Sequence, residues 1–155
     1  MPMKKALNII TLLAIANTAQ AFDWVVGGYD PGMMKSIAGY GASSSFNAYP
    51  TGADLDASAR INTVALNFDG RGIIAGSDMN GGYIGAVNVL EGSLVKVPLA
   101  DPNRIIFDRS AINRKSRAIV GGSHRVGGEF SVTTPRAFLV SESLVLTELM
   151  FPSGQ

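Results

Sequence analysis

A cluster of basic side chains is the part of this sequence whose chemistry is easiest to name. Residues 104–125 carry six of them against the single acid Asp108, so the stretch has a net charge of +5. If they project from one side, they can attract phosphates, sulfated glycans or anionic lipid headgroups; solvated loops and outward strand positions are the alternative. Aromatic residues do not alternate with them, so a single-stranded nucleic acid is not expected. The candidates are Arg104, Arg109, Arg114, Lys115, Arg117 and Arg125.

Residues 67–72, followed by Asp78, contain oxygen-bearing side chains that resemble part of a calcium loop. In such a loop, side-chain oxygens at alternate positions and a final carboxylate surround the cation. Arg71 stands where an oxygen ligand belongs, and a related stretch later in the chain has basic residues in two of these places. We therefore interpret the segment as a hairpin turn.

Catalytic and metal-binding residue types are scarce. His124 is the only histidine and the chain has no cysteine. Sites made of several histidines or of thiolates are thus excluded, and a Ser-His-Asp triad would have to use His124. We expect this histidine in a surface loop between Gly122 and Gly127. The paired glycines precede neither Gly-Lys-Ser nor a helix, which favours turns and strand ends over a phosphate loop. We predict no enzyme activity, cofactor or metal.

The chain also repeats itself. Residues 61–77 (INTVALNFDGRGIIAGS) and 107–123 (FDRSAINRKSRAIVGGS) align without a gap at an offset of 46, and six of the 17 positions are identical. About one identity is expected by chance. A weaker copy lies upstream, where residues 25–30 align with 73–78 at an offset of 48. Because a repeat unit buries the apolar face of its neighbour, this pattern indicates an architecture rather than a reaction.

Each full unit has the signals of four short antiparallel strands, separated by turn residues. In the second unit Leu144 is expected in the place of Leu94, where the offset grows to 50. The extra residues are expected in a loop at 124–134, and residues 43–58 in an exposed or loosely ordered connection. The expected strands are 61–66, 72–76, 83–89 and 93–97, then 110–113, 118–122, 137–140 and 143–149.

A period of 46 to 50 residues is the size of one β-propeller blade, which has about 40 to 50 residues. We therefore expect an all-β fold of tandem four-stranded antiparallel repeats in an incomplete, propeller-like array, with a β-sandwich as the alternative. Closed propellers have roughly four to eight blades, so two units and part of a third do not close a ring. Strand edges left open in this way invite association.

The first 21 residues have the pattern of a signal peptide. Lys4 and Lys5 precede a largely apolar run, and 19–21 (Ala-Gln-Ala) places small residues where signal peptidase reads. The run is too short and interrupted for a spanning helix, so no transmembrane span is expected in the mature chain. Residues 22–155 are expected to form one β-repeat domain, with a partial unit at 22–58 and full units at 61–100 and 105–150.

The two full units share Ala-Leu-Asn or Ala-Ile-Asn, then a short turn, then Gly-Ile-Ile-Ala-Gly-Ser or Ala-Ile-Val-Gly-Gly-Ser. Over residues 61–149 this pattern resembles repeats in the passenger regions of bacterial autotransporters. The resemblance implies an exported, surface-displayed β-repeat region that acts in adhesion or host contact and has no catalytic residues. An autotransporter ends in a membrane β-barrel, for which we expect no room after the second unit. The expected destinations are the periplasm, the cell surface or the extracellular space.

Three functions are open on this basis. The expected one is an exported, non-enzymatic protein for surface contact, adhesion or structure, with residues 104–125 as its contact region. The alternative is an enzyme or small-ligand binder, in which Asp78, Asp108 or His124 would converge in a propeller-type pocket. A further alternative is a truncated remnant of an autotransporter passenger. Expected partners are a copy of the chain, through open strand edges, or an anionic surface, and no specific nucleic acid.

Overall fold

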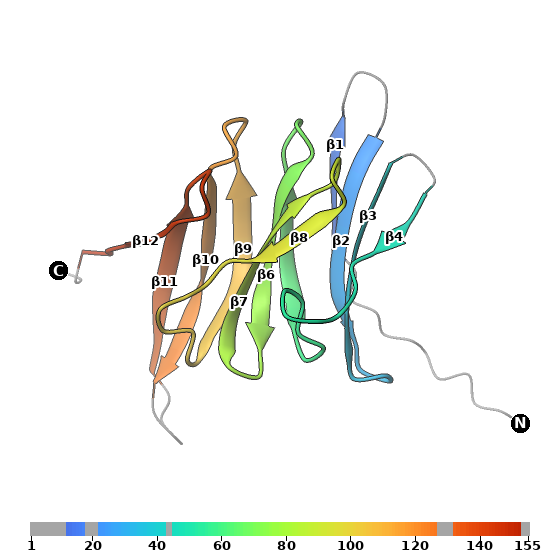
Figure 1. Ribbon diagram of the computed structural model, residues 1–155. Helices are drawn as coiled ribbons and strands as arrows, with labels where there is room; N and C mark the ends of the chain where they lie inside the picture. The colour runs from blue at the N-terminus through green and yellow to red at the C-terminus, as the bar shows by residue number, and fades with distance from the viewer. Residues whose placement is uncertain (1–11, 18–21, 43–44, 127–131, 153–155) are drawn as a thin grey trace, which may run out of the picture.

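The computed structural model describes residues 12–17, 22–42, 45–126 and 132–152, which form twelve strands and no helix (Figure 1). The prediction of an all-β fold is confirmed. The strands form three four-stranded antiparallel sheets, each built from consecutive strands of the chain. Within these ranges there is no helix long and apolar enough to cross a membrane.

The three sheets share one strand order, in which each strand pairs with the strand before and after it. The first sheet contains β1 (Leu12–Asn17), β2 (Phe22–Asp30), β3 (Lys35–Ala42) and β4 (Asn47–Ala48). The second contains β5 (Arg60–Leu66), β6 (Arg71–Asp78), β7 (Gly81–Asn88) and β8 (Ser93–Lys96). The third contains β9 (Ile105–Ile112), β10 (Ala118–Val126), β11 (Val132–Val140) and β12 (Leu146–Leu149).

The sheets stand side by side in chain order, and the second sheet lies between the other two (Figure 1). Its two faces belong to two separate cores. Ile74 and Tyr83 pack with apolar residues of the first sheet, whereas Ile73 and Ile84 pack with those of the third. Burial on both faces explains why β6 reads as a continuous apolar run rather than as an alternating pattern.

The repeat in the sequence is also a repeat in the structure. β5 and β9 each carry one extra residue at the same place, Asn62 and Asp108, where the pairing with the next strand shifts. The turns that follow match as well, because Asn67 and Asn113 each accept hydrogen bonds from the backbone N–H groups two and four residues later. The offset of 46 thus aligns residues with the same structural role.

The upstream copy forms a sheet of four strands, more than the partial unit expected at 22–58. Val25 packs in the core toward the second sheet, as Ile73, its partner at the offset of 48, packs toward the third. The additional strand is β1, which pairs with β2 and comes from the stretch predicted to be a signal peptide. Residues 1–11 and 18–21 of that predicted peptide lie outside the described residues.

The predicted exposed connection at 43–58 is wrong at two of its large apolar residues. Tyr49 and Leu55 are buried in the core between the first and second sheets. The Tyr83 hydroxyl donates a hydrogen bond of 2.6 Å to the carbonyl oxygen of Asp54, which ties the segment to β7. Irregular backbone can be buried where its polar groups find partners in this way, even though its sequence shows no periodicity. Residues 43–44 are outside the described ranges.

Two predictions for the third unit are also wrong. The loop expected at 124–134 is shorter, because β10 continues through Val126 and β11 begins at Val132, with 127–131 outside the described residues. Leu144 lies in the β11–β12 turn with a φ of 63°. Leu146 takes the place of Leu94. The reason is the β10–β11 hairpin, in which Ser123 pairs with Pro135 where its equivalent Ser77 pairs with Gly82, so that this hairpin is seven residues longer and not four as expected.

Candidate functional site

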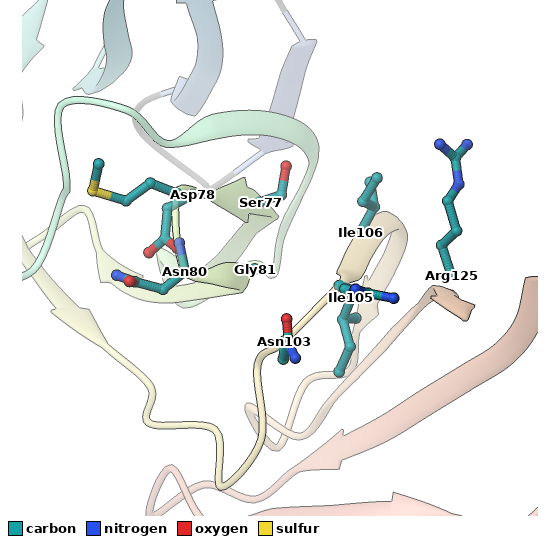
Figure 2. A pocket seen from close by; sticks show the side chains of 10 residues that line it. Ser77, Asp78, Asn80, Gly81, Asn103, Ile105, Ile106 and Arg125 are labelled. Carbon is teal, nitrogen blue, oxygen red and sulfur yellow. The ribbon is translucent and has the colours of Figure 1, made fainter. Parts of the chain in front are cut away.

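A cavity of about 410 Å³ lies between the second and third sheets. The β6–β7 turn forms one side, and the beginning of β9 with the end of β10 forms the other (Figure 2). Ser77, Asn80 and Asn103 line it with uncharged polar groups, and Ile105 and Ile106 with apolar ones. This is the place where two of the six predicted contact residues come together.

The connection between β8 and β9 positions this cavity. The Gly82 N–H donates a hydrogen bond of 2.7 Å to the carbonyl oxygen of Pro102. Gly81 has a φ of 121°, and a Cβ there would overlap the same carbonyl group. A glycine is therefore required at Gly81, both for its backbone conformation and for the close approach of the connection. This confirms the structural role expected for one of the glycine pairs.

Arg104 and Arg125 are the charged residues on the third-sheet side of the cavity. The Arg125 N–H donates a hydrogen bond of 3.1 Å to the carbonyl oxygen of Arg104. Arg104 has a φ of 56°, in the left-handed region that a residue with a Cβ rarely adopts. Both arginines are exposed, and neither forms an ion pair within the part of the chain that the structure describes.

The carboxylate in the cavity lining is already neutralised. The Asp78 side chain is 1% exposed, and its Oδ2 atom lies 2.9 Å from Nζ of Lys96. Figure 2 shows Asp78 and Asn80 on one side of the cavity and Arg125 on the other. With Asp78 paired to Lys96, the charge left for a ligand is that of the two arginines. The cavity therefore has the electrostatics of an anion site.

The residues behind Asp78 hold the β6–β7 turn in place. Lys96 Nζ lies 5.5 Å from the centre of the Tyr83 ring, and the Lys96 N–H donates a hydrogen bond to Asp54 Oδ1. Burial raises the pKa of the Tyr83 phenol above its ordinary value of 10.0, and the nearby carboxylates of Asp54 and Asp78 raise it further. Tyr83 is thus a protonated hydrogen-bond donor at neutral pH.

The six predicted contact residues do not form one patch. Arg114, Lys115 and Arg117 lie at the β9–β10 turn. Arg125 follows Arg117 by eight residues and lies near the other end of β10. At roughly 3.3 Å per residue this separates the two groups by about 26 Å. Arg109 lies between them on β9, and its guanidinium donates to the carbonyl of its neighbour Asp108. Arg114 stacks on the Phe68 ring, with 5.3 Å from its Cζ to the ring centre.

The residues considered for a catalytic cleft are scattered. Of the three, Asp78 lines the cavity described above, whereas Asp108 and His124 do not. Asp108 is exposed in the bulge of β9. His124 is part of β10, where it pairs with Ile105 on one side and Thr134 on the other. The surface loop expected around His124 is therefore wrong, because the β10–β11 hairpin extends past it.

Residues 67–72 form the hairpin turn that we expected in place of a calcium loop. The Asn67 Oδ1 atom accepts hydrogen bonds of 3.0 Å from the N–H groups of Asp69 and Arg71, and Gly70 has a φ of 71°. The oxygen that a cation would need is engaged by the backbone. Among the described residues, no three acidic, histidine or cysteine side chains gather into a possible metal site.

Sequence reasoning missed the apolar residues on the outer face of the third sheet. Ile119, Leu139 and Leu149 are exposed there. The signal that could have found them is the repeat itself, since Ile119 aligns with Ile73 and Ile73 is buried against the third sheet.

Comparison of the chain with family models, curated proteins and solved structures finds no match. The functional argument therefore rests on the geometry and charge of the chain itself.

Proposed function

We propose that this chain is an exported, non-enzymatic β-repeat protein that acts by contact with an anionic surface. The observation that carries the proposal is the cavity where Arg104 and Arg125 meet without an acidic partner while Asp78 is paired with Lys96. The ligand chemistry is a sulfate or phosphate group presented on a polymer or membrane. A role in surface contact is also what the resemblance to autotransporter passenger repeats implies.

The scaffold that we propose is an incomplete propeller. Each sheet is a four-stranded meander, as a propeller blade is. The first strands of the second and third sheets, β5 and β9, pack against each other, as the innermost strands of neighbouring blades do around an axis. In such an array the connections between blades gather at the ends of the strands. The cavity at the β8–β9 connection is a place of this kind.

The proposal is tested by binding of the full chain to two probes, heparin and vesicles that contain phosphatidylserine. The double variant Arg104→Ala/Arg125→Ala is compared with Arg114→Ala/Lys115→Ala, which removes the same charge at the opposite end of the sheet. Each arginine near an anionic surface contributes about 1 kcal/mol, so the cavity variant should bind about 30-fold more weakly. The control variant should lose much less.

The two probes separate the sources of the anionic group. Binding to heparin alone indicates a sulfated glycan, and binding to vesicles alone indicates a lipid headgroup. Absence of binding to both at physiological salt would overturn the proposal. Equal losses in the two double variants would overturn the assignment of the cavity, because they would mean that contact depends on bulk charge.

A further inference from the structure

The outer face of the third sheet, which points away from the second sheet, is apolar and uncovered. Ile119 is 43% exposed, and Leu139 and Leu149 are exposed beside it. The strand pairing puts these three side chains on one face, because Ile119 pairs with Leu139 and Leu149 with Ala137, two residues along. Such a face on β10, β11 and β12 would be costly to leave in water.

The repeat shows what this face is equivalent to. Ile119 aligns with Ile73 at the offset of 46. Ile73 is 2% exposed, because the third sheet covers it. Leu149 and Val97 likewise occupy equivalent positions at the ends of the last strands of their sheets. Val97 is buried in the core that contains Ile73. The exposed face is therefore the counterpart of a face that this fold buries against the next sheet.

The fold also shows what kind of surface covers such a face. Ile73 is covered by the inner face of the third sheet, which includes Val120. Val120 aligns with Ile74, and Ile74 aligns with Val26 of the first sheet. Val25 points toward the second sheet, so its neighbour Val26 belongs to the opposite, outer face of the first sheet. That outer face is thus the repeat equivalent of the surface that the third sheet lacks.

The outer face of the first sheet has an aromatic surface suited to this contact. The rings of Trp24 and Phe46 stack with their centres 5.6 Å apart and an angle of 13° between their planes. They lie on Gly39 and Gly41, where a Cβ would overlap the rings. Phe46 is 55% exposed. Exposed aromatic residues are enriched at the centres of protein interfaces.

We propose that two copies of the chain associate head to tail. The outer face of the third sheet of each copy covers the outer face of the first sheet of the other. One contact of this kind, used twice, closes a two-fold ring of six sheets, which is within the size range of closed propellers. The proposal shares the propeller-like arrangement with the proposed function but does not depend on anion binding.

Charge favours the head-to-tail arrangement over contact between two like faces. Residues 104–125 of the third sheet carry a net charge of +5. Residues 22–58, which supply three strands of the first sheet, contain four acids and one base, a net charge of −3. Two third sheets placed face to face would bring the Arg109 residues of the two copies together, because Arg109 pairs with Gly121, two residues along β10 from Ile119. Opposite ends attract instead, and like charges across an interface are costly.

The experiment is sedimentation equilibrium of the full chain over a range of concentrations, with monomers of 16.2 kDa distinguished from dimers of twice that mass. Ile119→Asp and Phe46→Asp place a charge on the two different faces. Each substitution affects both contacts of the ring, so each should weaken the dimer by about 1,000-fold, as expected for loss of a central anchor at two sites. Leu90→Asp, at an exposed apolar residue of the β7–β8 turn, is the matched control and should remain dimeric.

Circular dichroism is used to check that each variant is folded. If Ile119→Asp does not fold, Leu139→Lys replaces it. A wild-type chain that stays monomeric up to about 100 µM, roughly the weak end of specific protein association, would overturn the proposal. Assembly that survives Phe46→Asp but not Ile119→Asp would also overturn it, since only the third-sheet face would then be in contact. Species that keep growing with concentration would contradict a closed ring.

Discussion

Asn67 and Asn113 offer a direct measurement of what holds two neighbouring sheets together. Both cap the same turn, and each accepts two backbone hydrogen bonds through its side-chain oxygen. Asn67 is also buried, and its Nδ2 group donates to the carbonyl oxygen of Asn113 at 3.1 Å and to the hydroxyl of Ser116 at 3.2 Å. The Asn113 residue is exposed, and within the part of the chain that the structure describes its side chain makes only the two capping hydrogen bonds.

The difference in the free energy of unfolding between the two alanine variants should therefore equal the free energy that the contact between the sheets contributes. Loss of a solvated cap costs about 1 kcal/mol, so Asn113→Ala should lower the free energy of unfolding by that amount. Asn67→Ala also removes two partly buried hydrogen bonds at about 1 kcal/mol each, which makes its total about 3 kcal/mol. With a urea dependence of about 2 kcal/mol per molar, the midpoints should fall by about 0.5 M and 1.5 M.

The assay is urea-induced unfolding followed by circular dichroism, at a protein concentration where the chain is monomeric. Asn67→Asp is a further test, because it keeps an oxygen for the turn but replaces the donor with a carboxylate facing the Asn113 carbonyl oxygen. We expect this variant to be at least as unstable as Asn67→Ala. Equal midpoints for Asn67→Ala and Asn113→Ala, or a wild-type midpoint for Asn67→Asp, would refute the reasoning.

Two further predictions concern the first sheet and the segment that follows it. A Cβ at Gly27 would overlap the Ile61 side chain, so Gly27→Ala should destabilise the fold by about 1 to 3 kcal/mol, whereas Gly52→Ala, with open space around it, should leave the melting temperature unchanged. Hydrogen bonds from the Ser58 side chain and backbone hold the pKa of Asp56 below its ordinary value of 3.8. The stability that this carboxylate supplies is present above pH 3.8 and is lost as the pH falls through the lowered pKa. Ser58→Ala should raise that pKa in an NMR titration, and an unchanged value would contradict the assignment.

Local patterns were enough to predict the repeat and most of its strands. The alignment of 61–77 with 107–123 predicted two equivalent hairpins, and Asn67 and Asn113 do cap them in the same way. The positions of turns followed from glycine and polar residues, whose conformational preferences act within a few residues. The prediction failed where the length of a hairpin or turn changed, as at Leu144. The residue types on either side of it still resembled a strand.

Features that depend on contacts between sheets were not predictable in the same way. Tyr49 and Leu55 lie in a stretch without periodicity, and their burial depends on space that the first two sheets leave between them. The basic residues were correctly noted as a group, but the length of β10 separates them into two ends of the third sheet. A charge count along the chain contains no information on that distance.

β5 of the second sheet lies between the first and third sheets, and this position affects how cooperatively the chain unfolds. It packs against β1 and β2 on one side and against β9 on the other. Because β5 contacts both the first and the third sheet, a change in one of these sheets can affect the other through β5. Damage to β5 should loosen both ends together, whereas fraying of β4 or β12 can remain local. In a protein of stacked units, the middle one determines whether the chain melts as a single body or piece by piece.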